Sequence, residues 1–231
     1  MRISCDLDGV LADMDSALAD LAAAEFGISA RSRSQALKAR KTPAGTPADG
    51  GTDAQTANAS KDGTGEPPEL AGAAVLSRLT SRQQSRLWQR VRETRNFWES
   101  LHEHEPGIVR RFQHLAHQHR WDVLFVTQRP STAGHTAQIQ SQRWLRRHGF
   151  DLPAVYTTQA SRGPVAAALT IDAHIDDRLE NAVDVVSDSR AWSILVWRDD
   201  ESLDRVLAGA KALRITVVRT VAEALDRLAE A

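Results

Sequence analysis

The chain has 231 residues, which is long enough to bury a substantial core in one domain, or in one domain with a small accessory unit. Its formal net charge of −1 provides no overall positive field, so we expect neither a membrane nor a long nucleic acid as its partner. The single cysteine excludes an internal disulfide framework. No apolar run approaches the ~20 residues of a membrane-spanning helix. A strand is expected within a few residues of Met1, leaving no room for a secretory signal, so a cytoplasmic location is expected.

The first polar motif follows a short apolar strand that we expect over residues 2–6. Asp6 and Asp8 are two positions apart and Gly9 follows at once, so the chain should turn away just past the carboxyl end of the strand. Carboxylates at that end of a strand in an open α/β sheet lie where such sheets bind ligands. Two of them form a hard oxygen site suited to Mg²⁺. A surface turn is the alternative, because Asp-Gly is a common turn dipeptide.

The next part of the chain changes composition. A helix is expected over residues 13–26, ended by Gly27. Residues 31–72 are rich in small and polar residues and cannot bury enough apolar surface to offset their ordering entropy. We therefore expect a disordered insertion there, since long structureless loops are either lids or disordered. A helix is expected to resume the order at Thr80, because Gln83 completes the spacing of a capping box.

The remainder alternates short apolar runs with helical segments. This alternation predicts a parallel sheet with both faces covered, that is, an α/β fold with a three-layer doubly wound sheet. We expect strands over residues 123–127, 154–157, 172–176, 193–197 and 214–218, and helices from about residue 106 and over 133–148, 164–169, 178–187, 202–211 and 221–230.

Two of these strands also end in polar residues. Thr127 ends the strand over residues 123–127, and Asp176 and Asp177 end the strand near residue 172. Thr127 could simply be a β-branched residue favoured at a strand end. The two aspartates could form the cap and acidic first turn of the following helix, a role that does not prevent them from binding a metal.

The order D-x-D-G, then Thr, then D-D resembles the motifs of the haloacid dehalogenase (HAD) superfamily of phosphotransferases. Within it, the 5'(3')-deoxyribonucleotidase group is most similar, on the sequence NFWESL at residues 96–101, the following Pro-Gly, and the I-D-D-R ending at residues 175–178. The resemblance covers residues 1–26 and about 80–200.

The resemblance also implies a domain organisation. A HAD-like Rossmannoid core would comprise residues 1–13 and 106–231, with a small helical cap inserted after the first strand over residues 14–105. The expected insertion would lie within this cap.

The resemblance implies a role for each motif. Asp6 matches the nucleophile that attacks phosphorus and forms an aspartyl-phosphate, and Asp8 matches the general acid and base. Mg²⁺ would be held by Asp6, the backbone carbonyl of Asp8 and Asp177, with Asp176 acting through water or orienting its neighbours. Thr127 would contribute its hydroxyl to the transferring phosphoryl oxygens.

Other positions match the family less closely. Arg162 stands where the family has lysine; it could keep phosphate binding with reduced turnover, or be an exposed surface arginine. Phe97 and Trp98 match an aromatic segment that helps form the base pocket of deoxyribonucleotidases, although core packing is the alternative. Gln128 and Arg129 replace small residues at the mouth of the site. Arg129 could bind an extra anionic group of the substrate or pair with an acidic neighbour.

We therefore expect a hydrolase: a Mg²⁺-dependent phosphatase acting on a small phosphomonoester, with a 5'-nucleotide or deoxynucleotide as the favoured substrate. One alternative is a HAD phosphatase that acts on a phosphosugar or on the end of a polynucleotide, because polynucleotide phosphatases share the I-D-D-R ending. Another is a catalytically weak regulatory domain that binds phosphate and metal, for which Arg162 is the best support. The pattern leaves the oligomeric state open.

Overall fold

The computed structural model describes residues 1–27 and 76–231. The disordered insertion expected over residues 31–72 lies outside this part of the chain. The strands are β1 (Arg2–Cys5), β2 (Asp122–Thr127), β3 (Ala154–Thr157), β4 (Ala173–Asp176), β5 (Trp192–Val196) and β6 (Thr216–Val218). The helices of the described residues are α1 (Met14–Phe26), α4 (Ser81–Glu93), α5 (Ile108–His119), α6 (Ala137–Arg147), α7 (Arg162–Ala168), α8 (Leu179–Asp188), α9 (Leu203–Ala212) and α10 (Val221–Ala229), with a 3-10 turn η1 (Phe97–Glu99).

The six strands form one parallel sheet in the order β3-β2-β1-β4-β5-β6, which confirms the expected α/β architecture. β1 lies near the centre, where Cys5 pairs with Phe125 of β2 on one side and with Ile175 of β4 on the other. From β1 the chain adds strands on one side and then returns to add β4, β5 and β6 on the other. Such a reversal leaves a crevice at the carboxyl ends of the central strands, where open α/β sheets bind ligands.

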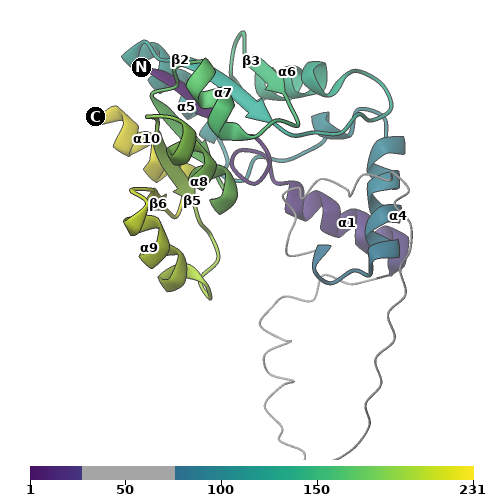
Figure 1. The fold of residues 1–231 in the computed structure, drawn as a ribbon. Coiled ribbons are helices and arrows are strands. Elements are labelled where there is room, and N and C mark those ends of the chain that lie inside the picture. The colour runs from purple at the N-terminus through teal and green to yellow at the C-terminus, as the bar shows by residue number, and fades with distance from the viewer. Residues whose placement is uncertain (28–75) are drawn as a thin grey trace, which may run out of the picture.

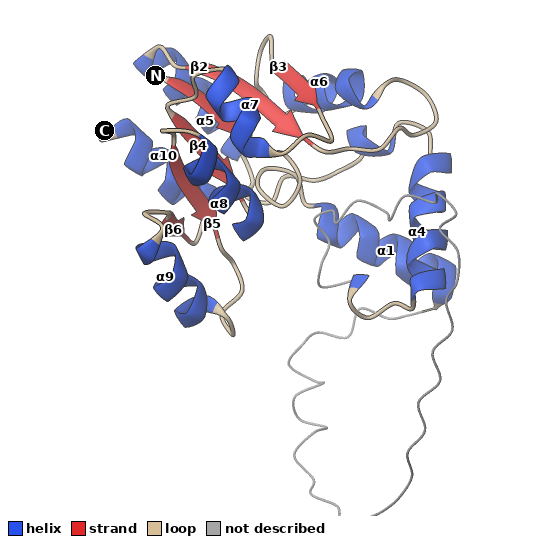
Figure 2. Cartoon of the chain, viewed as in Figure 1, coloured by secondary structure: helices blue, strands red, loops and turns tan. Residues whose placement is uncertain are grey.

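Helices cover both faces of the sheet and produce three layers (Figures 1 and 2). Right-handed crossovers place α5 and α6 on one face and α7, α8 and α9 on the other, because the direction of strand addition changes after β3. α7 packs against α8, and α10 packs against α5. The central strands are thereby buried on both faces, with Ile3, Phe125 and Ile175 fully enclosed.

Two helices near the start of the chain, α1 and α4, pack against each other and lie apart from the sheet (Figure 1). The carboxylate of Asp13 caps α1, and Gly27 ends the helix in a left-handed conformation with φ of 65°. The capping box expected at Thr80 and Gln83 is confirmed, because each side chain bonds to the backbone of the other. The buried residues of α4 are Leu87, Trp88 and Val91.

α6 begins later than expected, at Ala137 rather than at residue 133. Thr136 caps it by accepting a hydrogen bond from the amide of Ile139. The preceding residues bond to a distant segment: Ala133 N donates to Arg92 O, and Asn96 N donates to Ala133 O. These long-range hydrogen bonds compete with helix formation, and sequence periodicity alone does not reveal them.

α7 begins earlier than expected, at Arg162. The carboxylate of Asp184 in α8 accepts hydrogen bonds from the Ser161 hydroxyl and from the Gly163 amide, so a side chain of the neighbouring helix caps this one. Gly163 also lies directly against α8, where an added Cβ would overlap the carbonyl oxygen of Asp184. The absence of a side chain at Gly163 therefore lets α7 pack closely on α8.

Candidate metal and phosphate site

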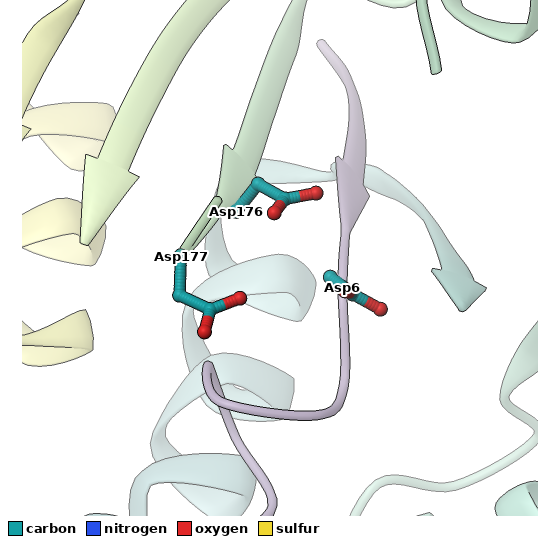
Figure 3. A group of neighbouring side chains, drawn as sticks. All are labelled: Asp6, Asp176 and Asp177. Carbon is teal, nitrogen blue, oxygen red and sulfur yellow. The ribbon is translucent and has the colours of Figure 1, made fainter. Parts of the chain in front are cut away.

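Three acidic side chains meet at the carboxyl edge of the sheet, where the central strands end (Figure 3). Asp6 directly follows β1, Asp176 is the last residue of β4, and Asp177 comes next. One carboxylate oxygen from each residue lies within 4.8 Å of the others. The early and late acidic motifs of the sequence therefore converge, because β1 and β4 are adjacent parallel strands.

The turn after β1 brings the backbone close to this cluster. The amides of Leu11 and Ala12 both donate to the carbonyl of Leu7, which closes a tight loop. Gly9 lies in this loop with φ of 77°, and an added Cβ would overlap the carboxylate of Asp177. Glycine is required here on two grounds, the left-handed conformation and the close approach.

The three carboxylates disfavour one another's negative charge in this buried setting. Burial, followed by the charge of Asp176, raises the pKa of Asp6 from 3.8 to about 7. Burial also raises the pKa of Asp177 well above its usual range, and the charges of Asp176 and Asp6 add to the effect. A divalent cation would offset this repulsion, and carboxylate oxygens are ligands that Mg²⁺ prefers.

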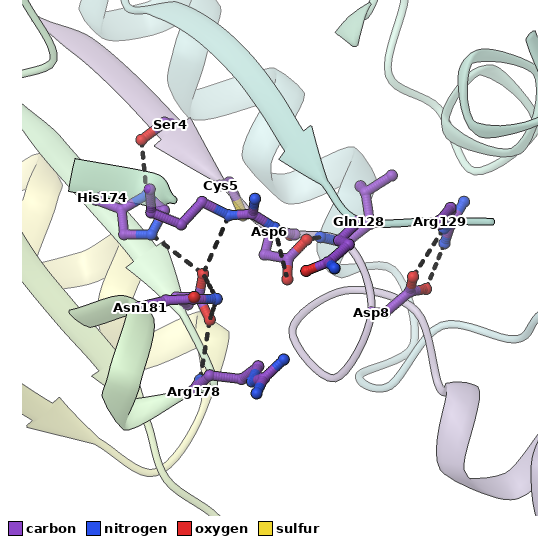
Figure 4. A network of polar contacts seen from close by, with 12 residues as sticks. Ser4, Cys5, Asp6, Asp8, Gln128, Arg129, His174, Arg178 and Asn181 are labelled. Atoms are coloured by element: carbon purple, nitrogen blue, oxygen red, sulfur yellow. Dashed lines mark hydrogen bonds and ion pairs between the residues drawn. The ribbon is translucent and has the colours of Figure 1, made fainter. Parts of the chain in front are cut away.

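Asp176 differs from the other two because protein donors surround it, among them His174 and Asn181, which Figure 4 labels. It accepts hydrogen bonds from Nε2 of His174 at 3.1 Å, from the amide of Arg178 at 2.9 Å and from the side-chain amide of Asn181 at 3.0 Å. Burial acts to raise its pKa, but the hydrogen bond from His174 and the charge of nearby Arg162 contribute to a net lowering. Asp176 is therefore held as a carboxylate in a fixed orientation.

Asp177 and Asp6 keep oxygen atoms that are available to an external ligand. Oδ1 of Asp177 is buried and has no hydrogen-bond partner within residues 1–27 and 76–231. Among the described residues, Asp6 receives one hydrogen bond, from the amide of Leu7 at 2.8 Å to Oδ1. A buried carboxylate oxygen without a donor is costly unless a cation neutralises it. The residues present thus fit a magnesium ion held mainly by Asp6 and Asp177.

The sequence motifs did not predict a buried chain of polar side chains behind the acids. The hydroxyl of Ser4 lies 2.7 Å from Nδ1 of His174, whose Nε2 contacts Asp176, and both side chains are buried. With its proton on Nε2, the ring donates to Asp176 and accepts from Ser4. The sequence does contain a signal for this chain. Ser4 precedes Asp6 by two residues and His174 precedes Asp176 by two residues, and this spacing places each pair on one face of its strand.

Arg198, which follows β5, was also missed. Its guanidinium donates to the carbonyl of Gly9 at 2.5 Å and pairs with Glu105 at 3.1 Å. Glu105 in turn accepts hydrogen bonds from the amides of Val221 and Ala222 at the start of α10. Arg198 therefore ties the loop after Asp6 to the C-terminal helix, a long-range contact for which we find no local sequence signal.

Arg162 lies inside the site. It is 4% exposed, which rules out the alternative of a surface arginine. Nη2 lies 3.9 Å from Oδ2 of Asp6, and Nε lies 3.9 Å from Oδ2 of Asp176. Nε is buried without a hydrogen-bond acceptor in the described part of the chain. A positive charge with an available N–H group thus lies beside the acids, as the resemblance implies for a phosphate-binding residue.

Thr127 and Gln128 lie where β2 ends, next to β1. Thr127 is fully buried, and its hydroxyl has no hydrogen-bond partner among the residues that the structure describes. The hydroxyl is therefore able to donate to a ligand. Gln128 lies further out and donates to the side-chain oxygen of Gln159 at 2.8 Å, an exposed contact between the loops after β2 and β3.

Arg129 forms an ion pair with Asp8 (Figure 4). Nε and Nη2 of Arg129 contact the two oxygens of Asp8 at 2.9 and 2.6 Å, and both side chains are buried. Of the two sequence interpretations of Arg129, the structure thus supports pairing with an acidic neighbour. An enclosed arginine whose charge is already matched is poorly placed to bind a second anionic group of a substrate.

The aromatic segment belongs to the core. Phe97 and Trp98 are 3% and 0% exposed, with their rings edge to face at 5.0 Å. The indole N–H of Trp98 donates to the carbonyl of Pro130. These contacts favour the core-packing interpretation over a stacking surface for a nucleotide base.

Comparisons with known proteins add no relative to these observations. No model of a known protein family matches the chain, and no curated protein matches it significantly. Among residues 1–27 and 76–231, no helix is both long and apolar enough to cross a membrane.

Proposed function

We propose that the protein is a Mg²⁺-dependent phosphatase that cleaves a small phosphomonoester through an aspartyl-phosphate on Asp6, as in the HAD superfamily that its motifs resemble. The main support is the convergence of Asp6, Asp176 and Asp177 with a buried arginine at the carboxyl ends of β1 and β4. Two distant, locally unremarkable acidic motifs would not need to share one buried site if each were only a turn or a helix cap.

Asp6 is suited to act as the nucleophile. Its Oδ1 accepts a hydrogen bond from the amide of Leu7, which fixes the rotation of the carboxylate. Its Oδ2 lies 3.9 Å from the guanidinium of Arg162, so we assign the attack on phosphorus to Oδ2. In that step the Oδ2–P bond forms, the bond from phosphorus to the leaving oxygen breaks, and the leaving oxygen receives its electron pair.

Mg²⁺ and the guanidinium of Arg162 would neutralise the negative charges of the Asp6 carboxylate and the phosphate as the two approach each other. Asp6, Asp177 and the backbone carbonyl of Asp8 would hold Mg²⁺, which when bound supplies positive charge between two anions. Arg162 and the hydroxyl of Thr127 donate to the phosphoryl oxygens. Arginine retains the charge expected from the family's lysine but presents it as a planar fork, which favours two parallel contacts to phosphate.

Asp8 completes the reaction through two proton transfers. Before the first step Asp8 must carry a proton taken up from solvent, which it gives to the leaving oxygen; in the second step the resulting carboxylate removes a proton from the attacking water. That water attacks phosphorus, the bond from phosphorus to Asp6 Oδ2 breaks, and phosphate is released. Both carboxylates are thereby restored to their starting state.

The proposed substrate is a small phosphomonoester, and a mononucleotide is the first to test because of the resemblance to deoxyribonucleotidases. The burial of Phe97 and Trp98 removes the residues that suggested base stacking. A phosphosugar or the end of a polynucleotide is therefore tested in the same panel. Phosphate release would be measured for each, with Mg²⁺ and with EDTA.

Asp6→Asn provides the decisive experiment. Activity should fall to background, because the amide cannot form the acyl-phosphate. Asp204→Asn, which changes an exposed acid in α9, is the matched control and should retain activity. Acid quench during turnover followed by mass spectrometry should locate a phosphoryl group on Asp6 in the wild type. Wild-type turnover by Asp6→Asn would contradict the mechanism, and Mg²⁺ binding without turnover on any substrate would favour a regulatory domain.

A further inference from the structure

We propose that Arg129 is a positioning residue that orients Asp8 for proton transfer, and that Trp98 and Ser141 act by holding Arg129. This inference rests on the proposed function, since it assigns a role within the same reaction. It also gives the aromatic segment a role other than contact with a substrate.

The contact between Arg129 and Asp8 restricts the carboxylate strongly. Nε donates to one oxygen of Asp8 at 2.9 Å and Nη2 to the other at 2.6 Å, so the planar fork fixes the plane of the carboxylate as well as its position. The side chains of Arg129 and Asp8 are 0% and 4% exposed, so water competes little for either partner. Figure 4 shows the carboxylate of Asp8 directed at Arg129.

The rest of the guanidinium is held from behind. Nη1 donates to the hydroxyl of Ser141 at 2.8 Å, and that hydroxyl donates to the carbonyl of Ala137 at 2.7 Å. The central carbon of the guanidinium lies 4.9 Å from the centre of the Trp98 ring, a cation–π contact. Trp98 is itself fixed, because its backbone amide donates to Gln140 at 3.1 Å.

Asp8 and the nucleophile are thus supported by different parts of the molecule. Asp8 is held by Arg129, which follows β2 and is itself held by Ser141 of α6 and Trp98 of η1. Asp6 and its acidic neighbours are held by β1, β4 and Arg162 in α7. A change at Arg129 should therefore affect proton transfer to the leaving oxygen while Mg²⁺ binding and the nucleophile stay intact.

The test compares two substrates that differ in their need for a proton. The phenolate of p-nitrophenyl phosphate leaves without one, whereas the alkoxide of a mononucleotide or of glycerol phosphate requires one as its bond to phosphorus breaks. We expect Arg129→Gln to lower kcat/KM for the alkyl phosphate roughly 10–100-fold more than for the aryl phosphate, within the range that general acids contribute. Asp8→Asn should change the ratio in the same direction and further.

Two milder variants and one control sharpen the result. Arg129→Lys keeps one charged donor, so its ratio of kcat/KM for the alkyl phosphate to kcat/KM for the aryl phosphate should lie between those of Arg129→Gln and the wild type. Ser141→Ala removes a support of the guanidinium without removing the ion pair, and should shift the ratio a few-fold in the same direction. Arg227→Gln makes the same chemical change in an exposed ion pair with Glu223 and should leave the ratio at its wild-type value. Mg²⁺ affinity, measured by calorimetry, should be unchanged in all of them.

Each outcome bears on the proposal. Equal losses on both substrates in Arg129→Gln and Ser141→Ala would overturn it, because they would indicate a structural role alone. If Arg129→Gln does not fold, an unchanged ratio in Arg129→Lys and Ser141→Ala has the same meaning. A wild-type protein that is inactive on both substrates would overturn the proposed function and this inference with it. If the wild type is active but the variants have the wild-type ratio of kcat/KM for the two substrates, only the role of Arg129 is overturned.

Discussion

Buried aspartates line one edge of the sheet, yet they fall into two groups. Asp8 and Asp176 are matched by protein donors, Asp8 by Arg129 and Asp176 by His174, Asn181 and a backbone amide. Asp6 is buried to a similar degree and Asp177 is half-buried, but in the described chain Asp6 has one backbone donor and the buried Oδ1 of Asp177 has none.

The difference indicates which carboxylates the fold orients and which it keeps for a ligand. A buried charge without a partner destabilises a protein, so its presence suggests a cation or substrate that supplies the missing charge. The raised pKa values of Asp6 and Asp177 and the lowered pKa of Asp176 follow the same division. The division implies that the two groups respond in opposite ways when a carboxylate is replaced.

After loss of the nucleophile, the largest effect is expected for Asp177→Asn. Activity should fall about 10²–10³-fold, because loss of a metal ligand weakens the charge stabilisation that Mg²⁺ supplies. The melting temperature in EDTA should nevertheless rise, since a repelling carboxylate is removed. Asp176→Asn should instead lower the melting temperature in EDTA, because three donors lose a charged acceptor. Melting temperatures that change in the same direction would contradict the division.

A second prediction concerns pH. The pKa of Asp6 is raised in the folded protein to about 7 from 3.8, so between these values the folded state binds more protons than the unfolded state. The free energy of unfolding of the metal-free protein should therefore decrease as pH rises from about 4 to about 7, by an amount on the order of a few kcal/mol.

Thermal melts in EDTA and in Mg²⁺ would measure this effect. The stabilisation by Mg²⁺ should grow over the same interval, because the ion binds the deprotonated carboxylates. Asp6→Asn removes the titrating group and serves as the matched comparison, with a flatter dependence on pH. If the melting temperature in EDTA changes with pH between 5 and 7 in the same way in the wild type and in Asp6→Asn, Asp6 is not the group with the raised pKa.

The fold and the positions of the acids could be predicted from the sequence because both depend on local pattern. Alternating apolar runs and helices predict a parallel sheet, and polar residues at the ends of its strands must then share one edge. This pattern is enough to place Asp6, Asp176, Asp177 and Thr127 at the same edge of the sheet. The expectation that the strands carrying these residues are neighbours came from the resemblance to the HAD superfamily.

The roles of other residues could not be predicted, because they depend on partners far away in the chain. Arg129 is enclosed only because α6 and η1 close around it, and Arg162 only because α7 packs against α8. His174 becomes a support of Asp176 through the register that places it beside Ser4. Strand register is set by the whole sheet, so alternation along one strand indicates a shared face but not the partner.

A third prediction concerns His174. His174→Leu should lower Mg²⁺ affinity about 10–100-fold, because Asp176 loses a donor that orients it next to the metal ligands. His174→Gln can still donate to Asp176 and should retain most of the affinity. His114→Leu changes an exposed histidine of α5 and is the control. Calorimetry would measure the affinity, and an unaltered value in a folded His174→Leu protein would assign this histidine to stability alone.

The smallest effect, and the most specific geometrically, is expected at Gly163. An added methyl group would overlap the carbonyl oxygen of Asp184, so Gly163→Ala should displace α7 from α8 and destabilise the fold by about 1–3 kcal/mol. Arg162 begins the same helix and should shift with it, raising KM for phosphate esters more than it lowers kcat. Gly209 lies within α9, and beyond its chain neighbours and the adjacent backbone of this helix no described atom lies within 4 Å of an added Cβ. Gly209→Ala should therefore stabilise the protein by up to about 1 kcal/mol and leave KM unchanged. Equal KM values in the two variants would mean that the contact between α7 and α8 does not position the arginine.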